Sequence, residues 1–438
     1  MTTLAAKYSI GIRLFLIALL SIVLLIPLFM IQALISEREI RRNEAVQEVS
    51  SKWGKAQTIA GPILTVPFKT YAIDAKGSAT TIIQHAHFLP DDLSISGAIQ
   101  PEVRYRGIYK VILYNTKLSI TGTFLTSSIK NFAIPEGEIM WDNASLAIGL
   151  TDMKGIKDTI RIKWNEKELP VNPGIASQDV QSSGISAPAA FNGTIDKYSF
   201  SIDINFNGSE ELAFVPIGKE TRVKISAAWG NPSFVGEFLP EAREIQEDRF
   251  SAEWKILHLN RNYPQRWTGS SYKIEPSAFG VKFVLPVDEY QKINRTAKYG
   301  VMFISLTFLS FFMIEILNKQ VMHPIQYLLI GFALLLFYTL LLSVSEHLGF
   351  QFSYVIASVA MTALIAGYTK AVLSNKLLAM VIAGILIILY GYLYVILQLQ
   401  DYALLMGSVG LFVILALVMY LTRRIDWYAM WKTSTEEV

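Results

Sequence analysis

The chain has 438 residues, of which 52% are hydrophobic and 17% are charged, and its formal net charge is only +3. A nucleic-acid-binding protein is expected to carry a basic surplus or stripe, so this balance argues against that class. The chain contains no cysteine, which excludes disulfides and thiolate metal sites and leaves the compartment to be inferred from the membrane pattern.

Residues 12–35 form the first predicted element. This run is apolar for 24 residues apart from Arg13 and Gln32, which is long enough to cross a hydrocarbon core of about 30 Å. A cleaved signal peptide is the competing interpretation, but its apolar region would be about 7–15 residues long and would end in a small-x-small site. We therefore expect residues 1–35 to be a cytoplasmic tip followed by an uncleaved transmembrane helix.

Residues 36–298 are predicted to form a large β-rich, sandwich-like domain that begins with a helical stalk. Residues 36–55 are charged and rich in helix formers, with apolar residues at helical spacing, and this stalk is expected to end at Gly54. Beyond it, β-branched and aromatic stretches alternate with turn residues, as in strands of a sandwich. The predicted strands are 63–73, 80–89, 103–113, 117–124, 198–206, 222–228, 249–257 and 279–285.

One segment of this domain lacks a periodic pattern. Residues 171–192 are rich in Ser, Gly, Pro and Ala, which is typical of a loop or linker. This segment either divides the domain into two β subdomains or is one long insertion in a single sandwich, because strand order cannot be read from periodicity. Residues 287–294 are expected to form a short helix that returns the chain to the membrane.

Five further apolar runs follow, and the connections between them are too short to hold soluble structure. Together with the first run they predict a membrane protein of mixed class with six transmembrane α-helices, one before the β-rich domain and five after it. The five-helix bundle covers residues 299–422, and residues 423–438 form a tail. The five runs are 299–317, 325–345, 352–372, 377–397 and 402–422.

The basic residues near these runs predict the orientation in the membrane. Short cytoplasmic loops carry an excess of Lys and Arg. With a cytoplasmic N-terminus, eight such residues fall inside, whereas the short outer loops near 346–351 and 398–401 contain none. Three arginines within 38–42 oppose this orientation, but glutamates alternate with them. We expect both termini in the cytoplasm and residues 36–298 in the periplasm of a bacterium. The eight residues are Lys7, Arg13, Lys319, Lys370, Lys376, Arg423, Arg424 and Lys432.

Polar residues at the ends of two runs are candidate functional groups. Glu346 beside His347 could relay protons or gate a pathway, although both side chains could reach water there and an ordinary polar boundary is the simpler interpretation. Glu315 lies in an apolar run near the predicted cytoplasmic boundary, and Lys319 follows four residues later. A local pair with Lys319 would explain Glu315 without a transport function.

Two further candidates lie in the β-rich domain. His85 and His87 would point to one face of a strand and could supply two metal ligands, but no third ligand is evident, so a packing role is simpler and no metal site is assigned. Trp229, Phe234 and Phe238 lie in an aromatic, proline-containing segment that could cover a groove or dock a partner. The alternative is that these rings belong to the hydrophobic core beneath a loop.

Motifs of the common enzyme classes are missing from the sequence. We find no Gly-x-Ser-x-Gly, no P-loop, no His-Glu-x-x-His and no dinucleotide fingerprint after a predicted strand. No catalytic or cofactor-binding residue is therefore assigned, no cofactor is expected, and the chain is expected not to be an enzyme.

Four long stretches read WGNPSFVGEFLPEARE (229–244), TAKYGVMFISLTFLSFF (296–312), HPIQYLLIGFALLLFYTLLLSVSEHLGF (323–350) and LTRRIDWY (421–428), with a weaker GPIL at 61–64. Together they resemble the CreD family of inner-membrane, cell-envelope integrity proteins. The resemblance implies association with a Cre-type two-component regulon and a role in envelope integrity and the response to cell-wall and β-lactam stress. It supplies neither a mechanism nor functional residues.

Three functions therefore stay open. The first is a non-enzymatic envelope protein whose periplasmic domain binds a lipid, a wall component or a protein partner, while the bundle anchors it in the lipid bilayer. The second is a transporter or channel, which would need polar residues that converge within the membrane, and the spans offer few. The third is a periplasmic hydrolase, which only the missing motifs oppose. We rank them in this order.

Overall fold

The computed structural model of the chain describes residues 10–73, 79–130, 134–285, 289–318, 320–399 and 402–423. The chain divides into two compact units, which are described one at a time. The membrane unit comprises the described residues up to Arg42 and those after residue 286, and the β unit comprises the described residues between them. Lys319 and the tail residues 424–438, which contribute to the predicted orientation, lie outside the described residues.

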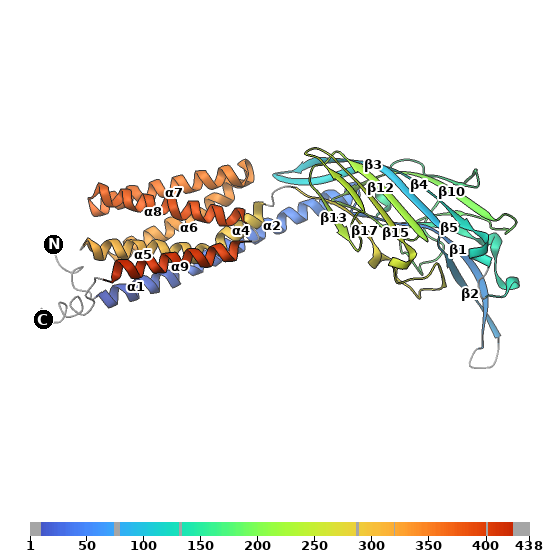
Figure 1. Cartoon of the computed structure of the whole chain (residues 1–438), viewed down its shortest axis with the longest axis horizontal. Coiled ribbons are helices and arrows are strands. Elements are labelled where there is room, and N and C mark those ends of the chain that lie inside the picture. Colours follow the sequence, from blue (N-terminus) through green and yellow to red (C-terminus); the bar gives the residue numbers. More distant parts are fainter. Residues whose placement is uncertain are drawn as a thin grey trace. The chain divides into compact units, whose positions relative to one another are not determined.

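Within its described residues the membrane unit has six helices that are long and apolar enough to cross a membrane. The first comprises α1 and the start of α2, which are separated only at Leu24, and the other five follow the β unit in the sequence (Figure 1). This arrangement confirms the prediction of one span followed by five. The helices are α1 (Ile10–Val23), α2 (Leu25–Trp53), α4 (Glu289–Lys298), α5 (Gly300–Leu317), α6 (Pro324–Leu348), α7 (Phe350–Leu373), α8 (Lys376–Gln398) and α9 (Ala403–Thr422).

The first span packs closely against the C-terminal helices. A Cβ at Gly331 of α6 would clash with the Leu24 side chain, and a Cβ at Gly300 of α5 would lie 2.8 Å from Leu28. Small residues of this kind let membrane helices approach each other. The first span is thus held by shape-matched packing within the membrane unit. Its buried face, with exposed fractions of 0–8%, consists of Leu24, Leu28, Ile31 and Ile35.

The β unit contains one nine-stranded and one eight-stranded sheet. The first has the order β13-β17-β11-β1-β5-β9-β8, with β2 added beside β1 and β16 beside β2, and the second has the order β14-β15-β12-β3-β4-β10-β6-β7. Neighbouring strands are antiparallel except for β1 with β11 and β3 with β12. The first sheet is built from β1 (Gln57–Ile73), β2 (Ala79–Phe88), β5 (Ser145–Leu150), β8 (Asn172–Pro173), β9 (Gly184–Pro188), β11 (Glu211–Phe214), β13 (Pro232–Gly236), β16 (Arg266–Thr268) and β17 (Phe279–Phe283). The second is built from β3 (Asp92–Arg106), β4 (Tyr109–Leu125), β6 (Arg161–Trp164), β7 (Lys167–Leu169), β10 (Lys197–Ser209), β12 (Glu220–Ala227), β14 (Ala242–Ile245) and β15 (Phe250–Leu257), and a short helix α3 (Thr126–Lys130) follows β4.

The two sheets enclose one hydrophobic core, which matches the predicted sandwich-like β-rich fold. Alternate residues along β12 and β15 are buried, as expected for strands that cover a core with one face. Aromatic rings from opposite sheets meet in this core. Trp254 of β15 lies 5.5 Å from Phe279 of β17, and Tyr114 of β4 lies 5.5 Å from Phe283 of β17, measured between ring centroids.

Two predicted elements of the β unit differ from the structure. The strand predicted at 103–113 is instead the end of β3, a tight turn at Gly107 and Ile108, and the start of β4. Gly107 has a φ of +62°, a left-handed conformation that glycine adopts easily and that reverses the chain there. The segment 171–192, predicted to be a loop, contributes the short strands β8 and β9 to the nine-stranded sheet.

Candidate functional site

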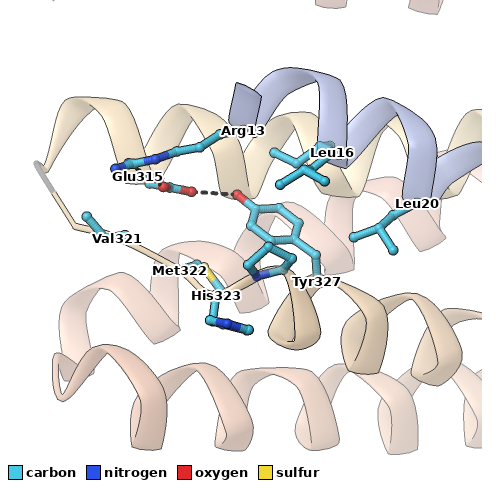
Figure 2. A pocket seen from close by; sticks show the side chains of 10 residues that line it. Arg13, Leu16, Leu20, Glu315, Val321, Met322, His323 and Tyr327 are labelled. Atoms are coloured by element: carbon cyan, nitrogen blue, oxygen red, sulfur yellow. Dashed lines mark hydrogen bonds and ion pairs between the residues drawn. The ribbon is translucent and has the colours of Figure 1, made fainter. Parts of the chain in front are cut away.

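The most buried carboxylate among the described residues of the membrane unit is Glu315, near the end of α5. Its two carboxylate oxygens have different partners (Figure 2). Arg13 of α1 donates a hydrogen bond to Oε1 at 3.0 Å, and the Tyr327 hydroxyl of α6 donates one to Oε2 at 2.9 Å. The side chain of Glu315 is only 3% exposed and that of Arg13 is 21% exposed. Three helices therefore meet in one buried, charge-neutral cluster.

Local structure at the start of α6 places Tyr327 in this cluster. His323 caps the helix, since its imidazole accepts a hydrogen bond from the backbone N–H of Ile325, and Pro324 occupies the first turn. The Tyr327 ring then packs edge-on against Phe308 of α5, with centroids 5.5 Å apart. A cavity of about 30 Å³ beside the cluster is lined by Arg13, Glu315, His323 and Tyr327 among others, which is room for a water molecule.

These contacts change the interpretation of Glu315. The sequence suggested a local pair with Lys319, which lies outside the described residues. The partners that the structure shows are Arg13, 302 positions away, and Tyr327. No periodic pattern in the sequence connects Glu315 to the first span, so only the presence of one charge in each of two apolar runs could have suggested this pair.

Glu346, at the other end of α6, belongs to a second polar cluster. The Tyr290 hydroxyl of α4 donates a hydrogen bond to its carboxylate at 3.1 Å, and the Arg38 guanidinium of α2 lies 3.9 Å away. Arg42 stacks over the Tyr290 ring, 5.5 Å from its centroid. His347 is exposed, whereas Glu346 is half-buried. A joint functional role of the two residues stays a prediction.

The arginines that opposed the predicted orientation all have acidic partners nearby. Besides Arg38 beside Glu346, Arg41 pairs with Glu37 at 2.6 Å and Arg42 lies 3.9 Å from Glu39. Paired charges on one helix face largely neutralise each other's field. This stretch of α2 therefore carries much less effective positive charge than its arginine count suggests.

Hydroxyl groups within the apolar helices mostly bond to their own backbone. Thr307, Ser353, Ser358 and Thr369 each donate to the carbonyl four residues earlier at 2.7–2.8 Å. Such back-bonded hydroxyls satisfy themselves and present little polarity to a passing solute. Among the described spans, the buried hydroxyls of Tyr338 and Tyr390 are exceptions, because they have no hydrogen-bond partner.

The aromatic segment predicted as a docking surface connects the two sheets of the β unit at their edges. β13 at its start pairs with β17 of one sheet, and β14 at its end pairs with β15 of the other. Phe234 packs edge-on against Trp254 at 5.7 Å, Phe238 against Phe279 at 6.1 Å, and Trp229 against Phe283 at 6.1 Å. These half-buried rings form the margin of the core, with one side available to solvent.

His85 and His87 of β2 lie close to an acidic residue that no sequence pattern connects with them. His87 Nε2 lies 3.3 Å and His85 Nδ1 lies 3.6 Å from Oδ2 of Asp179, in the segment between β8 and β9. The Thr65 hydroxyl of β1 lies 3.1 Å from His87 Nδ1. A neutral imidazole that accepts from Thr65 and donates to Asp179 satisfies all three groups.

The arrangement of Thr65, His87 and Asp179 has the order of a nucleophile, a base and an orienting acid, but it is closed to substrate. Thr65 is 3% exposed and His87 is 1% exposed. Burial lowers the pKa of His87 to about 4, against the opposing effect of Asp179. Burial alone would raise the pKa of Asp179, but hydrogen bonds from Ser177 and His87 hold it below its usual value. The cluster is best explained as a hydrogen-bonded clamp that fixes the 171–192 segment on β2.

No group of three His, Cys, Asp or Glu side chains in the described ranges is placed to hold a metal ion. The cluster at His87 uses both ring nitrogens of that histidine in hydrogen bonds, which is consistent with this finding.

Comparison with known proteins shows similarity over nearly the full chain. The family model described as "Inner membrane protein CreD" matches residues 9–428. The chain is also 32% identical, over 416 residues, to inner membrane protein CreD of Escherichia coli (strain K12), and this alignment covers 93% of the chain and 91% of that relative.

Proposed function

The chain belongs to the CreD family of inner membrane proteins, and from this membership we propose that it is a non-enzymatic protein that supports cell-envelope integrity and the response to envelope and cell-wall stress. In this proposal the membrane unit anchors the protein in the lipid bilayer. The β unit carries out the function by binding an envelope lipid, a wall component or a protein partner.

The observation that carries this proposal is the way the membrane unit uses its polar groups. Glu315 and Glu346 are each engaged by an arginine and a tyrosine at the ends of helices, and the hydroxyls within the spans mostly bond to their own backbone. A transporter needs polar groups that face a path and change partners during transport. A bundle whose carboxylates are paired and whose Ser and Thr hydroxyls mostly bond to their own backbone is better suited to anchoring, even though the buried hydroxyls of Tyr338 and Tyr390 have no hydrogen-bond partner among the described residues. The β unit is then the binding part.

We further propose that the N- and C-termini are cytoplasmic and that residues 36–298 are periplasmic. The basic residues in the short connections favour this orientation, and Arg38, Arg41 and Arg42 belong to a long segment, which crosses the membrane largely regardless of its charge.

The native chain lacks cysteine, so single cysteines test this orientation directly. Ser182→Cys lies on the exposed surface of the β unit, and Ser374→Cys lies in the exposed connection between α7 and α8. In intact spheroplasts a membrane-impermeant maleimide should label Ser182→Cys and leave Ser374→Cys unlabelled until the membrane is opened. The reverse labelling pattern would refute the orientation.

The binding surface that we propose contains Trp229, Phe234 and Phe238, whose rings combine exposed faces with firm support from the core. Aromatic side chains held in this way are typical anchors of binding surfaces. At the membrane end, Glu346 and His347 stay secondary candidates, because Glu346 is already engaged by Tyr290.

Replacement of both phenylalanines tests this surface. The double variant Phe234→Leu, Phe238→Leu keeps apolar volume in the core but removes the rings, and Tyr105→Leu removes an aromatic ring that is 67% exposed elsewhere on the β unit. We expect the double variant alone to lose co-purifying lipids or proteins and to lose tolerance to cell-wall stress. Retention of both properties in a folded double variant would count against the binding surface, and absence of any retained molecule on the native protein would count against the binding function itself.

A further inference from the structure

The ribbon formed by β1 and β2 extends beyond the sheet that holds it (Figure 1). The pairing of β1 with β5 ends at Thr65, and the pairing of β2 with β16 begins only at Ala86. The two strands nevertheless stay paired with each other out to Ile73 and Ala79. An isolated bridge joins Phe68 to Ile139, and the Tyr71 hydroxyl donates hydrogen bonds to Glu138. Apart from these contacts on the β1 side, the distal part of the ribbon, residues 69–73 and 79–84, has no third strand within the described part of the chain.

Both faces of this distal ribbon are exposed. Neighbouring residues of a strand point to opposite faces, yet Ile82 is 43% exposed and Ile83 is 57% exposed. Tyr71, on the partner strand, is 61% exposed. A two-stranded ribbon is only marginally stable in water, and large apolar side chains on both of its faces add to that problem. Further strands would supply the missing backbone hydrogen bonds and would bury part of the exposed apolar side chains.

The other edges of the β unit are protected, in contrast to this one. β14 carries Arg243 and Glu244, and β7 has only three residues, two of them charged. On the nine-stranded sheet, β8 has two residues and ends in proline, β13 begins with proline, and β16 has three residues. Charge, proline and shortness are the usual protections of sheet edges. The distal half of β2, residues 79–84, has the sequence Ala-Thr-Thr-Ile-Ile-Gln and contains neither a charged residue nor a proline.

The backbone direction shows which residues of β2 face the open edge. Gly269 N–H donates to the carbonyl of His85, so His85 presents its backbone groups to the outer side of β2. Because this direction alternates along a strand, Ile83 and Thr81 present their N–H and C=O groups to the same side. Between Ala79 and Gln84 no strand of the described residues accepts them.

We propose that this open edge, residues 79–84 of β2, pairs with the same edge of a second copy of the chain. The strand that completes the edge must be extended, uncharged and itself open on one side, and the distal half of β2 has all three properties. Two copies related by a twofold axis would form an antiparallel four-stranded ribbon, in which each open donor meets an acceptor. The small contact suits a protein whose copies are concentrated in one membrane, because confinement raises their effective concentration.

Cysteine cross-linking tests the pairing on the full-length chain in native membranes. Thr81→Cys, Ile82→Cys and Ile83→Cys are introduced one at a time, and Ala242→Cys on the protected edge strand β14 is the matched control. Under mild oxidation we expect at least one of the three β2 variants to give a disulfide-linked product at twice the chain mass of 49.1 kDa, and Ala242→Cys to give none. Addition of Ile83→Lys to the Thr81→Cys variant should remove that product, because a lysine on an edge strand opposes its pairing with a further strand.

Each other outcome refutes the proposal. Cross-linking at positions 81–83 no stronger than at position 242 would show that the edge does not pair with a second copy. A product that contains a different protein would show that the edge has another partner. Persistence of the dimer with Ile83→Lys, while the melting temperature of that variant equals that of the native chain, would show that the cross-link arises from random collision.

Discussion

At the scale of single residues, the membrane unit neutralises its charges through partners that are distant in the sequence. An isolated charge within a membrane span costs roughly 2.5–3.5 kcal/mol on insertion scales. Glu315 meets Arg13 and Tyr327, and Glu346 meets Arg38 and Tyr290, so each carboxylate has a cation and a hydroxyl nearby. The first span contributes the cation in both clusters.

Loss of one partner of the Arg13–Glu315 pair should destabilise the protein more than loss of both. Glu315→Gln removes the carboxylate partner of Arg13, and Arg13→Gln leaves a buried carboxylate without its cation, at a cost of about 3 kcal/mol each. In the double variant no charge is left unpaired, so part of the stability should return. Thermal unfolding in detergent, analysed as a double-mutant cycle, measures this coupling. Strictly additive losses would contradict it.

Acid should destabilise the β unit through His87. Its pKa of about 4 in the folded chain lies below the ordinary value of 6.5, so between these values the unfolded chain binds a proton that the folded chain does not. Stability therefore falls as the pH drops from about 6.5 toward 4, by up to about 3 kcal/mol. The lowered pKa of Asp179 extends this loss to still lower pH.

Tryptophan fluorescence can follow this transition, because the Trp267 ring lies 5.7 Å from the His87 ring. His87→Gln cannot take up the proton, so its unfolding midpoint should depend less on pH over this range than that of the native chain. An equally steep pH dependence in both proteins would assign the effect to other groups.

The residues of these clusters show what could be predicted from the sequence. His85 and His87 were recognised as a pair because their spacing places them on one face of a strand. Asp179 was not recognised, because it lies 92 positions from His87 in a segment without periodicity. Tyr290 and Tyr327 were missed for a similar reason, since a tyrosine near an apolar run is ordinary until its hydroxyl is seen to meet a carboxylate.

At the scale of helices and strands, small residues decide which helices touch. Gly331 lies against Leu24 of the first span, whereas a Cβ at Gly367 of α7 would meet nothing within 4 Å. Both are glycines within apolar helices, and the sequence alone does not distinguish them.

Gly331→Leu should therefore loosen the first span from the bundle, whereas Gly367→Leu should have little effect. Overpacking of a close contact typically costs 1–3 kcal/mol. The two variants differ in the site of substitution but not in the residue introduced, so helix propensity is controlled. Their melting temperatures in the same detergent measure the difference, and equal values would mean that the Gly331 contact adapts without strain.

Secondary structure followed from the sequence where the hydrophobic pattern was long and regular. The six apolar helices were predicted because length alone identifies a span, and Tyr198–Phe206 was recognised by its strict alternation as part of β10. The sequence pattern predicts one strand at 103–113, where the structure has the β3–β4 hairpin. The turn comprises only Gly107 and Ile108, and two residues are too few to interrupt the strand-like hydrophobic pattern visibly. The pairing of β1 with β11 and of β3 with β12 involves strands more than 100 positions apart, which periodicity cannot connect.

At the scale of the whole molecule, the chain is two compact units that share one helix, because α2 begins in the membrane unit and ends in the β unit. The end of α2 is well held within the β unit. Trp53 donates to the carbonyl of Tyr114, and Arg104 stacks over its ring at 4.2 Å. Glu48 accepts hydrogen bonds from Arg106, which lower its pKa together with those from Lys52.

The two units should unfold in separate transitions. The two units have separate hydrophobic cores. The membrane unit is suited to a lipid environment and the β unit to water, so we do not expect them to unfold as one cooperative unit. Calorimetry of the full chain in detergent should show two heat-absorption peaks, and His87→Gln should move only one of them. A single peak that moves as a whole would show that the units unfold together.

The Arg13–Glu315 pair also has a consequence for the time course of synthesis. The two residues are 302 positions apart, so at about 5–20 residues per second the arginine is made roughly 15–60 seconds before its partner. During that interval the first helix lacks its Glu315 partner, while the entire β unit is still being translated. Synthesis of the end of α5 and the start of α6 then provides the carboxylate and the tyrosine in quick succession. Bundle assembly is thus a late event, and a ribosome that stalls before position 315 leaves the first helix without the carboxylate that it meets in the finished bundle.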